Sequence, residues 1–291
     1  MIRFFQRRWK WICSLLLAGL VLGLAASWLF GSVYSAPCNH PVALPKDLPV
    51  EQVTFPSASG ATIHGWLIAS QTNRGVVILQ HGVHADKSSL VGRAKFLSQN
   101  GYAVLMFDFQ AHGESIGKQI TFGYLESRDS QAAVEFVKKR FPGKPIAVIG
   151  VSLGAAAAAL ANPPLDVQAM VLEMMYPTIV DATKDRIEMR LGSLGRCLSP
   201  LLTWQIKLRG VCTTDDLRPI VAVAKISAPK LFLAGTADRE TKFNEAKAIF
   251  TNAAQPKMFV PFEGARHEDL LHYSPEQYKK TVLEFLDKNL K

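Results

Sequence analysis

The sequence predicts a single α/β domain with a largely parallel sheet, and two patterns predict it. Unbroken apolar runs recur from residue 75 onward, and amphipathic helical patterns separate them. Such runs are typical of parallel strands that helices cover on both faces. The regular alternation of strand and helix places these strands in one sheet.

The composition fits one large domain and excludes several other classes. The chain has 291 residues, of which 48% are hydrophobic and 20% charged, so it is too apolar for a disordered protein. Four cysteines are too few for a disulfide scaffold. The net charge of +9 is partly a terminal feature, because Arg3, Arg7, Arg8 and Lys10 carry four of the positive charges. No later cluster of basic and aromatic residues indicates binding to nucleic acid.

Residues 1–10 form a basic segment, and residues 11–34 form an uncharged apolar one. A helix of about 20 apolar residues crosses a hydrocarbon core about 30 Å thick. Since basic residues before a span stay in the cytoplasm, we expect residues 11–34 to anchor the chain in a membrane, with the main domain outside the cytoplasm. The alternative is a signal peptide cleaved after Ser35, which would leave a secreted or periplasmic protein.

Residues 35–50 contain four prolines and no periodic pattern. Because proline restricts φ, we expect an extended stalk there. The domain then occupies residues 51–291. Cys197 and Cys212 both lie within it, and the sequence leaves open whether they pair or are free.

The predicted strands begin with an alternating pair at 51–55 and 61–69, which suits an antiparallel hairpin. Continuous apolar runs follow at 75–80, 102–107, 146–149, 168–172, 230–234 and 257–261. Helical patterns lie at 87–99, 127–140, 153–161, 241–253 and 275–289. A leucine-rich segment at about 177–217 is longer than a crossover requires. We expect it to form a helical lid over the carboxyl ends of the strands.

The motif Gly150-Val-Ser152-Leu-Gly154 follows one of these strands directly and opens an alanine-rich helix. A serine at such a corner sits on a sharp turn, where bulky neighbours would clash and glycine is needed on both sides. The turn exposes the hydroxyl at the amino end of a helix, where the helix dipole favours developing negative charge. Ser152 is therefore the candidate nucleophile.

A nucleophilic serine needs a base, and the base needs an acid that orients it. His267 follows the last predicted strand and Asp238 follows the strand before it, so all three residues lie at carboxyl ends of strands, where an open α/β sheet places its site. Glu173, at the end of the strand 168–172, is an alternative acid. His272, five residues beyond His267, is an alternative base.

These motifs resemble those of the α/β-hydrolase-fold serine hydrolases, and the resemblance covers about residues 51–290. The similarity is to the lysophospholipase-like and serine-aminopeptidase-like branch, which includes members with an N-terminal membrane anchor. It implies a mostly parallel eight-stranded sheet with helices on both faces and a small helical lid. It also implies Ser152 as nucleophile, His267 as general base and Asp238 as its orienting acid.

Two further segments carry the resemblance. Residues 81–84 (HGVH) resemble the loop that supplies an oxyanion-hole amide, and the implied donors are the backbone N–H groups of Val83 and Leu153. Residues 108–115 (DFQAHGES) resemble a structural loop of the family, but Gln110 and Ala111 replace its usual Arg-Gly. This departure bears on local packing more than on the chemistry.

The resemblance implies a serine hydrolase that cleaves an ester or related acyl bond through an acyl-enzyme. Peptidases and thioesterases use the same three residues and remain alternatives. A non-catalytic binding protein on this fold is disfavoured, because no member of the motif set is missing. We expect a small-molecule or lipid-like acyl substrate, no organic cofactor and no metal, since the histidines lack a cluster of other ligands at familiar spacing.

Overall fold

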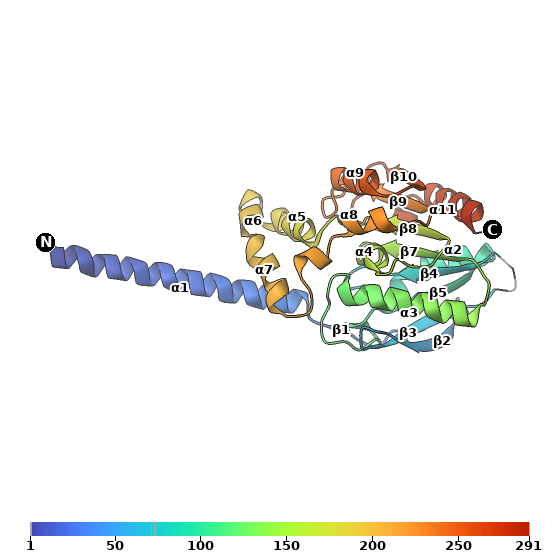
Figure 1. The fold of residues 1–291 in the computed structure, drawn as a ribbon, viewed down its shortest axis with the longest axis horizontal. Helices are drawn as coiled ribbons and strands as arrows, with labels where there is room; N and C mark the ends of the chain where they lie inside the picture. Colours follow the sequence, from blue (N-terminus) through green and yellow to red (C-terminus); the bar gives the residue numbers. More distant parts are fainter. Residues whose placement is uncertain (1, 71, 73, 291) are drawn as a thin grey trace.

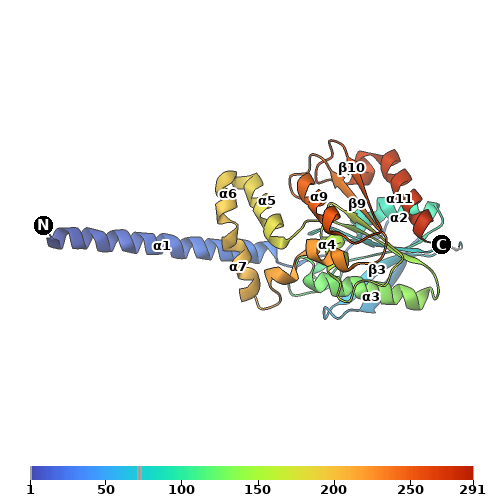
Figure 2. The same cartoon turned by 45° about the horizontal axis from the view of Figure 1, so that its top comes forward.

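The computed structural model describes residues 2–70, 72 and 74–290, with side chains from residue 8 onward. One long helix, α1 (Ile2–Tyr34), projects from a domain in which helices surround a central sheet (Figure 1). The view of Figure 2 shows the same arrangement, with three helices of the domain grouped around the end of α1. The chain thus places its apolar N-terminal helix at one end of the α/β domain.

Apolar runs of the sequence form the strands. In chain order these are β1 (Cys38–Asn39), β2 (Glu51–Pro56), β3 (Thr62–Ile68), β4 (Val76–Gln80), β5 (Ala103–Phe107), β6 (His112–Gly113), β7 (Ile146–Val151), β8 (Ala169–Glu173), β9 (Lys230–Gly235) and β10 (Lys257–Phe262). Among the described residues, eight strands form one sheet in the order β10-β9-β8-β7-β4-β5-β3-β2. Only the pairs β2–β3 and β3–β5 of this sheet are antiparallel. The predicted hairpin and mostly parallel eight-stranded sheet are confirmed.

The helices of the domain are α2 (Val91–Gln99), α3 (Tyr124–Arg140), α4 (Leu153–Leu160), α5 (Ile179–Leu191), α6 (Ser193–Leu198), α7 (Pro200–Leu208), α8 (Pro219–Ala222), α9 (Phe243–Asn252), α10 (Leu270–Tyr273) and α11 (Pro275–Asn289). Three short 3₁₀ turns add η1 (Lys87–Leu90), η2 (Thr214–Asp216) and η3 (Val223–Lys225). One face of the sheet packs against α2 and α11, and the other against α3, α4 and α9.

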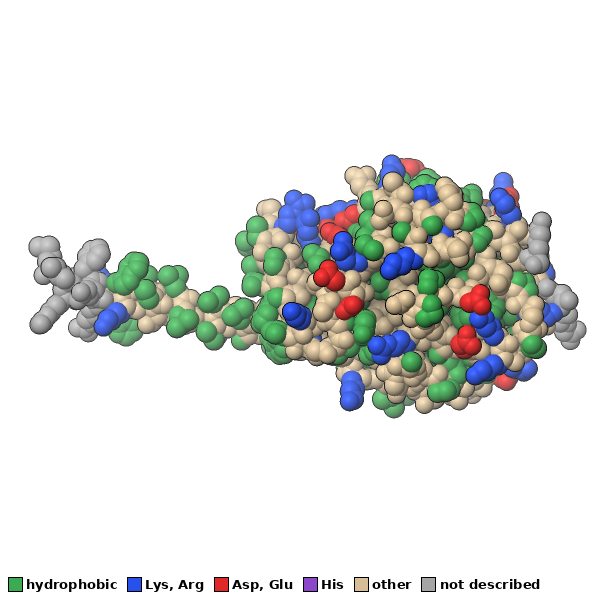
Figure 3. Space-filling model, in the orientation of Figure 1, with side chains coloured by type: hydrophobic (Ala, Val, Ile, Leu, Met, Phe, Trp, Pro, Cys, Tyr) green, Lys and Arg blue, Asp and Glu red, His purple; other side chains and the backbone are tan. Residues whose placement is uncertain are grey.

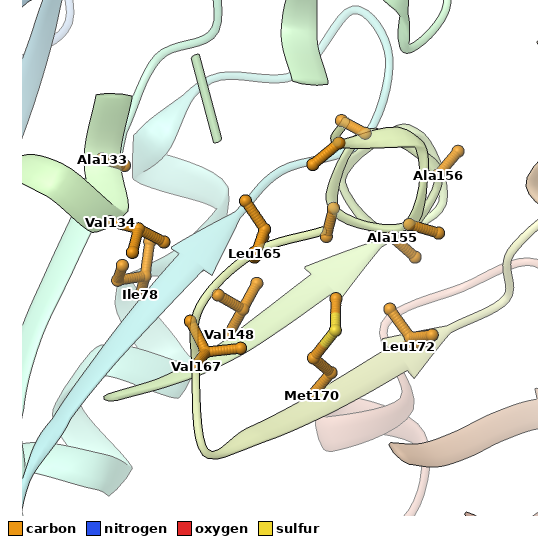
Figure 4. Packing of buried hydrophobic residues seen from close by; sticks show 14 of the residues in the cluster. Ile78, Ala133, Val134, Val148, Ala155, Ala156, Leu165, Val167, Met170 and Leu172 are labelled. Atoms are coloured by element: carbon orange, nitrogen blue, oxygen red, sulfur yellow. The ribbon is translucent and has the colours of Figure 1, made fainter. Parts of the chain in front are cut away.

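Alternate residues of each strand face opposite layers, which explains the unbroken apolar runs. On β4, Val76 and Ile78 belong to the core under α3 and α4, whereas Val77 and Leu79 belong to the core under α2 and α11. A strand buried on both faces has no polar side to show in its pattern. Figure 4 shows Ile78 close to Val134 of α3, within the first of these two cores.

The helices α5, α6 and α7 occupy the segment 177–217 that the sequence predicts as a lid. They lie beside the end of α1 that adjoins the domain in both ribbon views (Figures 1 and 2). Cys197, on α6, is exposed and Cys212 is half-buried. Both are free cysteines, which answers the question that the sequence leaves open.

Residues 35–50, which the prolines predict to be an extended stalk, lie against the domain. Strand β1 pairs in parallel with β6. The side-chain amide of Asn39 donates to the backbone carbonyls of Gly113, at 3.1 Å, and Ser115, at 2.9 Å. Prolines favour extension, but they carry no information about a partner elsewhere in the chain. This segment therefore fixes α1 close to the domain and is not a free spacer.

A buried ion pair joins the start of η1 to the loop after β5. The ammonium of Lys87 lies 2.6 Å from the carboxylate of Asp108, and both side chains are fully buried. Asp108 also accepts hydrogen bonds from the backbone N–H groups of Lys87 and Glu114. Because both carboxylate oxygens are used, the pair holds the loops that follow β4 and β5 in one arrangement.

We predict that Lys87→Met lowers the free energy of unfolding by about 3–5 kcal/mol, because it leaves the carboxylate of Asp108 buried without its cation. Urea unfolding of the detergent-solubilised protein measures the loss. Lys138→Met is the matched control, since Lys138 pairs with Asp166 at the surface and exposed pairs contribute at most about 1 kcal/mol. Equal losses for the two variants would contradict this account of the pair.

Candidate active site

Ser152 stands at the corner between β7 and α4 in a strained backbone conformation. Its φ is 51° and its ψ is −107°, a region that costs a non-glycine residue about 1–3 kcal/mol. Hydrogen bonds hold it there: its N–H donates to the carbonyl of Glu173 at 2.8 Å, and its carbonyl accepts from Ala156 at 3.0 Å. The surrounding sheet and helix thus impose the conformation of the serine.

The two glycines of the motif are required by close backbone contacts. A Cβ at Gly150 would lie 2.5 Å from the backbone nitrogen of Ala155, and a Cβ at Gly154 would overlap the backbone carbonyl of Gln80 on β4. Real Cβ atoms do not approach backbone so closely. Glycine at 150 lets the turn fold onto the start of α4, and glycine at 154 lets that helix start against β4, as the spacing of the motif predicts.

The structure brings together the three residues that the sequence singles out. The Nε2 atom of His267 lies 3.2 Å from Oγ of Ser152, and its Nδ1 atom lies 2.8 Å from Oδ2 of Asp238. Ser152 and Asp238 are buried, while the side chain of His267 keeps 17% of its surface exposed. The three side chains come from the segments that follow β7, β9 and β10. Ser152 and His267 are 115 residues apart in the sequence.

Asp238 is held as an ionised acceptor. Burial alone would raise the pKa of its carboxyl, but hydrogen bonds from His267 and Thr241 outweigh burial and lower the pKa below its usual value. The hydroxyl of Thr241 donates at 2.6 Å and its backbone N–H at 3.0 Å. Because an ionised carboxylate only accepts, Nδ1 of His267 carries the proton, and Nε2 is left free to accept one from Ser152.

The alternative acid and base lie in other surroundings. Glu173 is buried at the end of β8, where its carboxylate pairs with the guanidinium of Arg93 at 2.7 Å and accepts a hydrogen bond from the hydroxyl of Tyr278. His272 is exposed on α10. The imidazole that faces both Ser152 and Asp238 is that of His267.

The loop after β4 positions the first expected oxyanion donor. Val83 lines the same cavity as Ser152, and its N–H donates no hydrogen bond within the described part of the chain. Leu153 is the first residue of α4, so its N–H has no acceptor within the helix. Both N–H groups are therefore available to an oxygen atom bound beside Ser152.

His81 shapes this loop as a neutral imidazole. Burial lowers the pKa of its side chain to about 3. Its Nε2 atom accepts from the backbone N–H of Phe109 at 3.1 Å, and its Nδ1 atom lies 2.7 Å from the carbonyl of Gly82.

Among the described residues, no group of three or more His, Cys, Asp or Glu side chains is placed to hold a metal ion.

The loop 108–115 accommodates its two unusual residues. Gln110 is buried and donates to the carboxylate of Glu126 at 2.7 Å and the carbonyl of Gln119 at 2.8 Å. Ala111 has a φ of 60°, in the left-handed region that glycine occupies without strain. The Ala111 substitution thus costs some backbone strain, while Gln110 makes its own hydrogen bonds.

Two cavities of different character meet at Ser152. One, of about 130 Å³, lies under the lid and is lined mainly by apolar side chains, among them Phe122, Tyr176, Ile179, Ile187 and Leu217. The other, of about 310 Å³, is more polar, and its lining combines apolar side chains with Arg93, Glu240, His267, Glu268 and Asp269. A substrate bound at the serine can thus place an apolar group on one side and a polar group on the other.

Sequence reasoning missed the contribution of α1 to the first cavity. Phe30, Gly31 and Tyr34, near the end of this helix, line the cavity together with the lid. Because α1 is apolar all round, its sequence marks no face that packs against protein. Two polar residues were a signal of such a contact: Gln205 within the apolar helix α7, and Arg209 directly after it. Both form hydrogen bonds to α1.

Comparison with known proteins agrees with this architecture. Residues 71–184 match the family described as serine aminopeptidase, S33. The uncharacterized protein YqkD of Bacillus subtilis is 27% identical over 246 residues, covering 82% of this chain and 80% of that protein. The α/β hydrolase domain-containing protein WAV2 of Arabidopsis thaliana is 28% identical over 256 residues, covering 82% and 79%.

Solved esterase structures share the fold. The esterase Pf2001 of Pyrococcus furiosus superposes with a TM-score of 0.72 at 25% identity, over 89% of this chain and all of that one. The esterase EaEST of Exiguobacterium antarcticum gives a TM-score of 0.61 at 18% identity, over 81% and 99%. The sheet topology and these neighbours show that the chain has the α/β-hydrolase fold, and the family match agrees with it.

Proposed function

We propose that this protein is a serine hydrolase that cleaves an ester through an acyl-enzyme, with Ser152 as nucleophile, His267 as general base and Asp238 as the acid that orients it. The hydrogen-bonded series from Ser152 through His267 to Asp238, on a strained turn at the amino end of a helix, carries the proposal. This arrangement is that of a serine activated by a neighbouring base.

The proposed reaction has two similar halves. Nε2 of His267 takes the hydroxyl proton as Oγ of Ser152 attacks the carbonyl carbon, and the N–H groups of Val83 and Leu153 stabilise the oxyanion, at about 3 kcal/mol for each donor. His267 then gives its proton to the leaving alcohol. Water attacks the acyl-enzyme in the same manner, with His267 again as base, and releases the acid.

The two cavities support an ester that joins an apolar acyl group to a polar alcohol. The apolar cavity under the lid suits the acyl group, and the polar cleft beside His267 suits the leaving group. In the cleft, Glu240 and Asp269 pair with Arg186 and Arg93. Because Arg93 also pairs with Glu173 and Glu268 lines the cleft too, acidic side chains outnumber basic ones there, which disfavours an anionic leaving group.

The lining of the acyl cavity disfavours an aminopeptidase. Such an enzyme binds the free ammonium group of its substrate on the acyl side of the scissile bond, where an acidic side chain must meet it. The described lining of this cavity holds Arg186, Arg190 and Arg209 and no aspartate or glutamate. Arg186 is paired with Glu240, so Arg190 and Arg209 are the arginines that would repel the ammonium group. A thioester has no such group, so thioesterase activity remains a second reading of the same site.

We propose further that α1 anchors the protein in a membrane with its basic end in the cytoplasm. Residues Arg8–Tyr34 form a helix that is long and apolar enough to span a bilayer, a property that a signal sequence shares. The basic residues that precede the span support this orientation. The hydrolase domain would then lie outside the cytoplasm, next to the membrane surface.

A fluorophosphonate probe tests the nucleophile. We expect the wild-type protein to label stoichiometrically, because the probe phosphorylates an activated serine, and we expect Ser152→Ala to abolish the labelling. Intact-protein mass spectrometry measures the adduct. Ser130→Ala, at a buried serine of α3 outside the site, is the control and should label like the wild type. Labelling of Ser152→Ala would refute the assignment.

Paired histidine substitutions test the base. His267→Ala should lower kcat for a p-nitrophenyl ester by a factor of roughly 10⁴, since Ser152 then has no proton acceptor. His272→Ala should leave kcat unchanged, because its ring is exposed on α10. Steady-state kinetics measures both. The reverse pattern, with His272→Ala inactive, would move the base to that residue.

A further inference from the structure

Polar side chains of the lid bind the backbone of α1. The amide of Gln205, which is almost fully buried, donates to the carbonyl of Ser27 at 2.9 Å. The guanidinium of Arg209 donates to the carbonyl of Trp28 at 3.1 Å and to the hydroxyl of Ser32 at 3.0 Å. It also lies 4.5 Å from the centre of the Trp28 ring. Buried bonds of this kind define one relative position of α1 and α7.

Gly31 allows the two helices to approach closely. A Cβ at this position would overlap Oε1 of Gln205. One turn earlier, the rings of Trp28 and Trp204 lie 6.4 Å apart. The crossing of α1 and α7 is therefore close at Gly31 and Gln205, while the rings of Trp28 and Trp204 beside it stay partly exposed.

The end of α1 is also fastened to the loops around Ser152. The ring of Tyr34 stacks on Phe122 at 5.8 Å and meets the edge of His84 at 5.1 Å. Nε2 of His84 lies 3.0 Å from the carbonyl of Tyr34. Ser35 is buried, and its carbonyl accepts from Ile120 at 2.8 Å. His84 is the residue after Val83. The end of α1 is therefore in direct contact with the loop that carries the proposed oxyanion donor.

These contacts give the last turns of α1 two different faces. Phe30 and Tyr34, whose rings stack at 6.1 Å, line the cavity that reaches Ser152. Leu29 and Val33, on neighbouring positions, are 65% and 68% exposed and do not line it. The same turns of helix therefore contribute both a wall of the cavity and an outward apolar surface.

The lid continues this outward surface with apolar side chains of its own. Its exposed apolar side chains are Leu191, Leu194, Leu198, Trp204 and Leu208. Figure 3 shows hydrophobic side chains along α1 and at the end of the domain from which α1 projects. A surface with exposed leucines and a tryptophan is complementary to the interface of a membrane.

We infer that α1 forms one wall of the acyl site and that the substrate is a long-chain lipid ester, which enters from the membrane with its acyl chain between α1 and the lid. The inference rests on the proposed function, because it assigns the apolar cavity to the acyl group. It makes Phe30 and Tyr34, residues of the anchor helix, determinants of acyl-chain specificity. It also requires α1 to stay attached, since cleavage after Ser35 would remove this wall.

Matched substitutions on adjacent residues of α1 test the inference. The full-length protein is reconstituted in vesicles of phosphatidylcholine and phosphatidylglycerol, and kcat/KM is measured for p-nitrophenyl butyrate and p-nitrophenyl laurate. We expect the wild type to prefer laurate and Phe30→Ala to lower the laurate-to-butyrate ratio roughly tenfold, through lost apolar contact with the chain. Leu29→Ala removes a similar apolar area from the outward face and should keep the wild-type ratio.

Labelling by the fluorophosphonate probe checks that each variant retains a folded site. Equal ratios for wild type, Phe30→Ala and Leu29→Ala, or a wild-type preference for butyrate, would overturn the inference while leaving the serine hydrolase assignment intact. A wild-type protein that neither labels nor hydrolyses either ester would overturn the proposed function and this inference with it. Mature protein from the native membrane that begins after Ser35 would also overturn it.

Discussion

The packing of the Ser152 turn against β4 is the constraint on which the rest of the site depends. Gly154 lets α4 start directly beside the carbonyl of Gln80, and the five alanines that follow allow α4 to lie close to the sheet. The strained φ of Ser152 is stable only because the sheet and the helix fix both sides of the turn. A wider turn would move Oγ away from His267, and the hydrogen-bonded series would be lost.

Much of the fold could be predicted from the sequence because its signals are local. A strand buried on both faces shows as an apolar run, and the elbow motif shows as two glycines around a serine. Asp238 and His267 each follow a predicted strand, so sheet topology alone places them near Ser152. These inferences needed no knowledge of side-chain contacts.

The remaining features depend on pairs of residues that are distant in the sequence. Lys87 and Asp108 become a buried pair only when two loops meet. The prolines of residues 35–50 predict extension, but the pairing of β1 with β6 requires a partner more than 70 residues away. The apolar pattern of α1 predicts a span and conceals the face that packs on the lid. Gln205 and Arg209 identify the face of α1 that packs on the lid, but only when it is known that they donate to the carbonyls of Ser27 and Trp28.

The attachment of the lid to α1 has a consequence for how the bilayer acts on the site. The uncharged apolar part of α1, residues 11–34, is about 36 Å long and slightly exceeds a hydrocarbon core of about 30 Å. A membrane-spanning α1 relieves such a mismatch by tilting, and its tilt follows the thickness of the bilayer. The residue after α7 and the loop at His84 form hydrogen bonds to the same end of α1. A change of tilt would therefore shift the side chains of α1 that line the acyl cavity. Lipid composition would then tune the enzyme mechanically, as well as supplying its substrate.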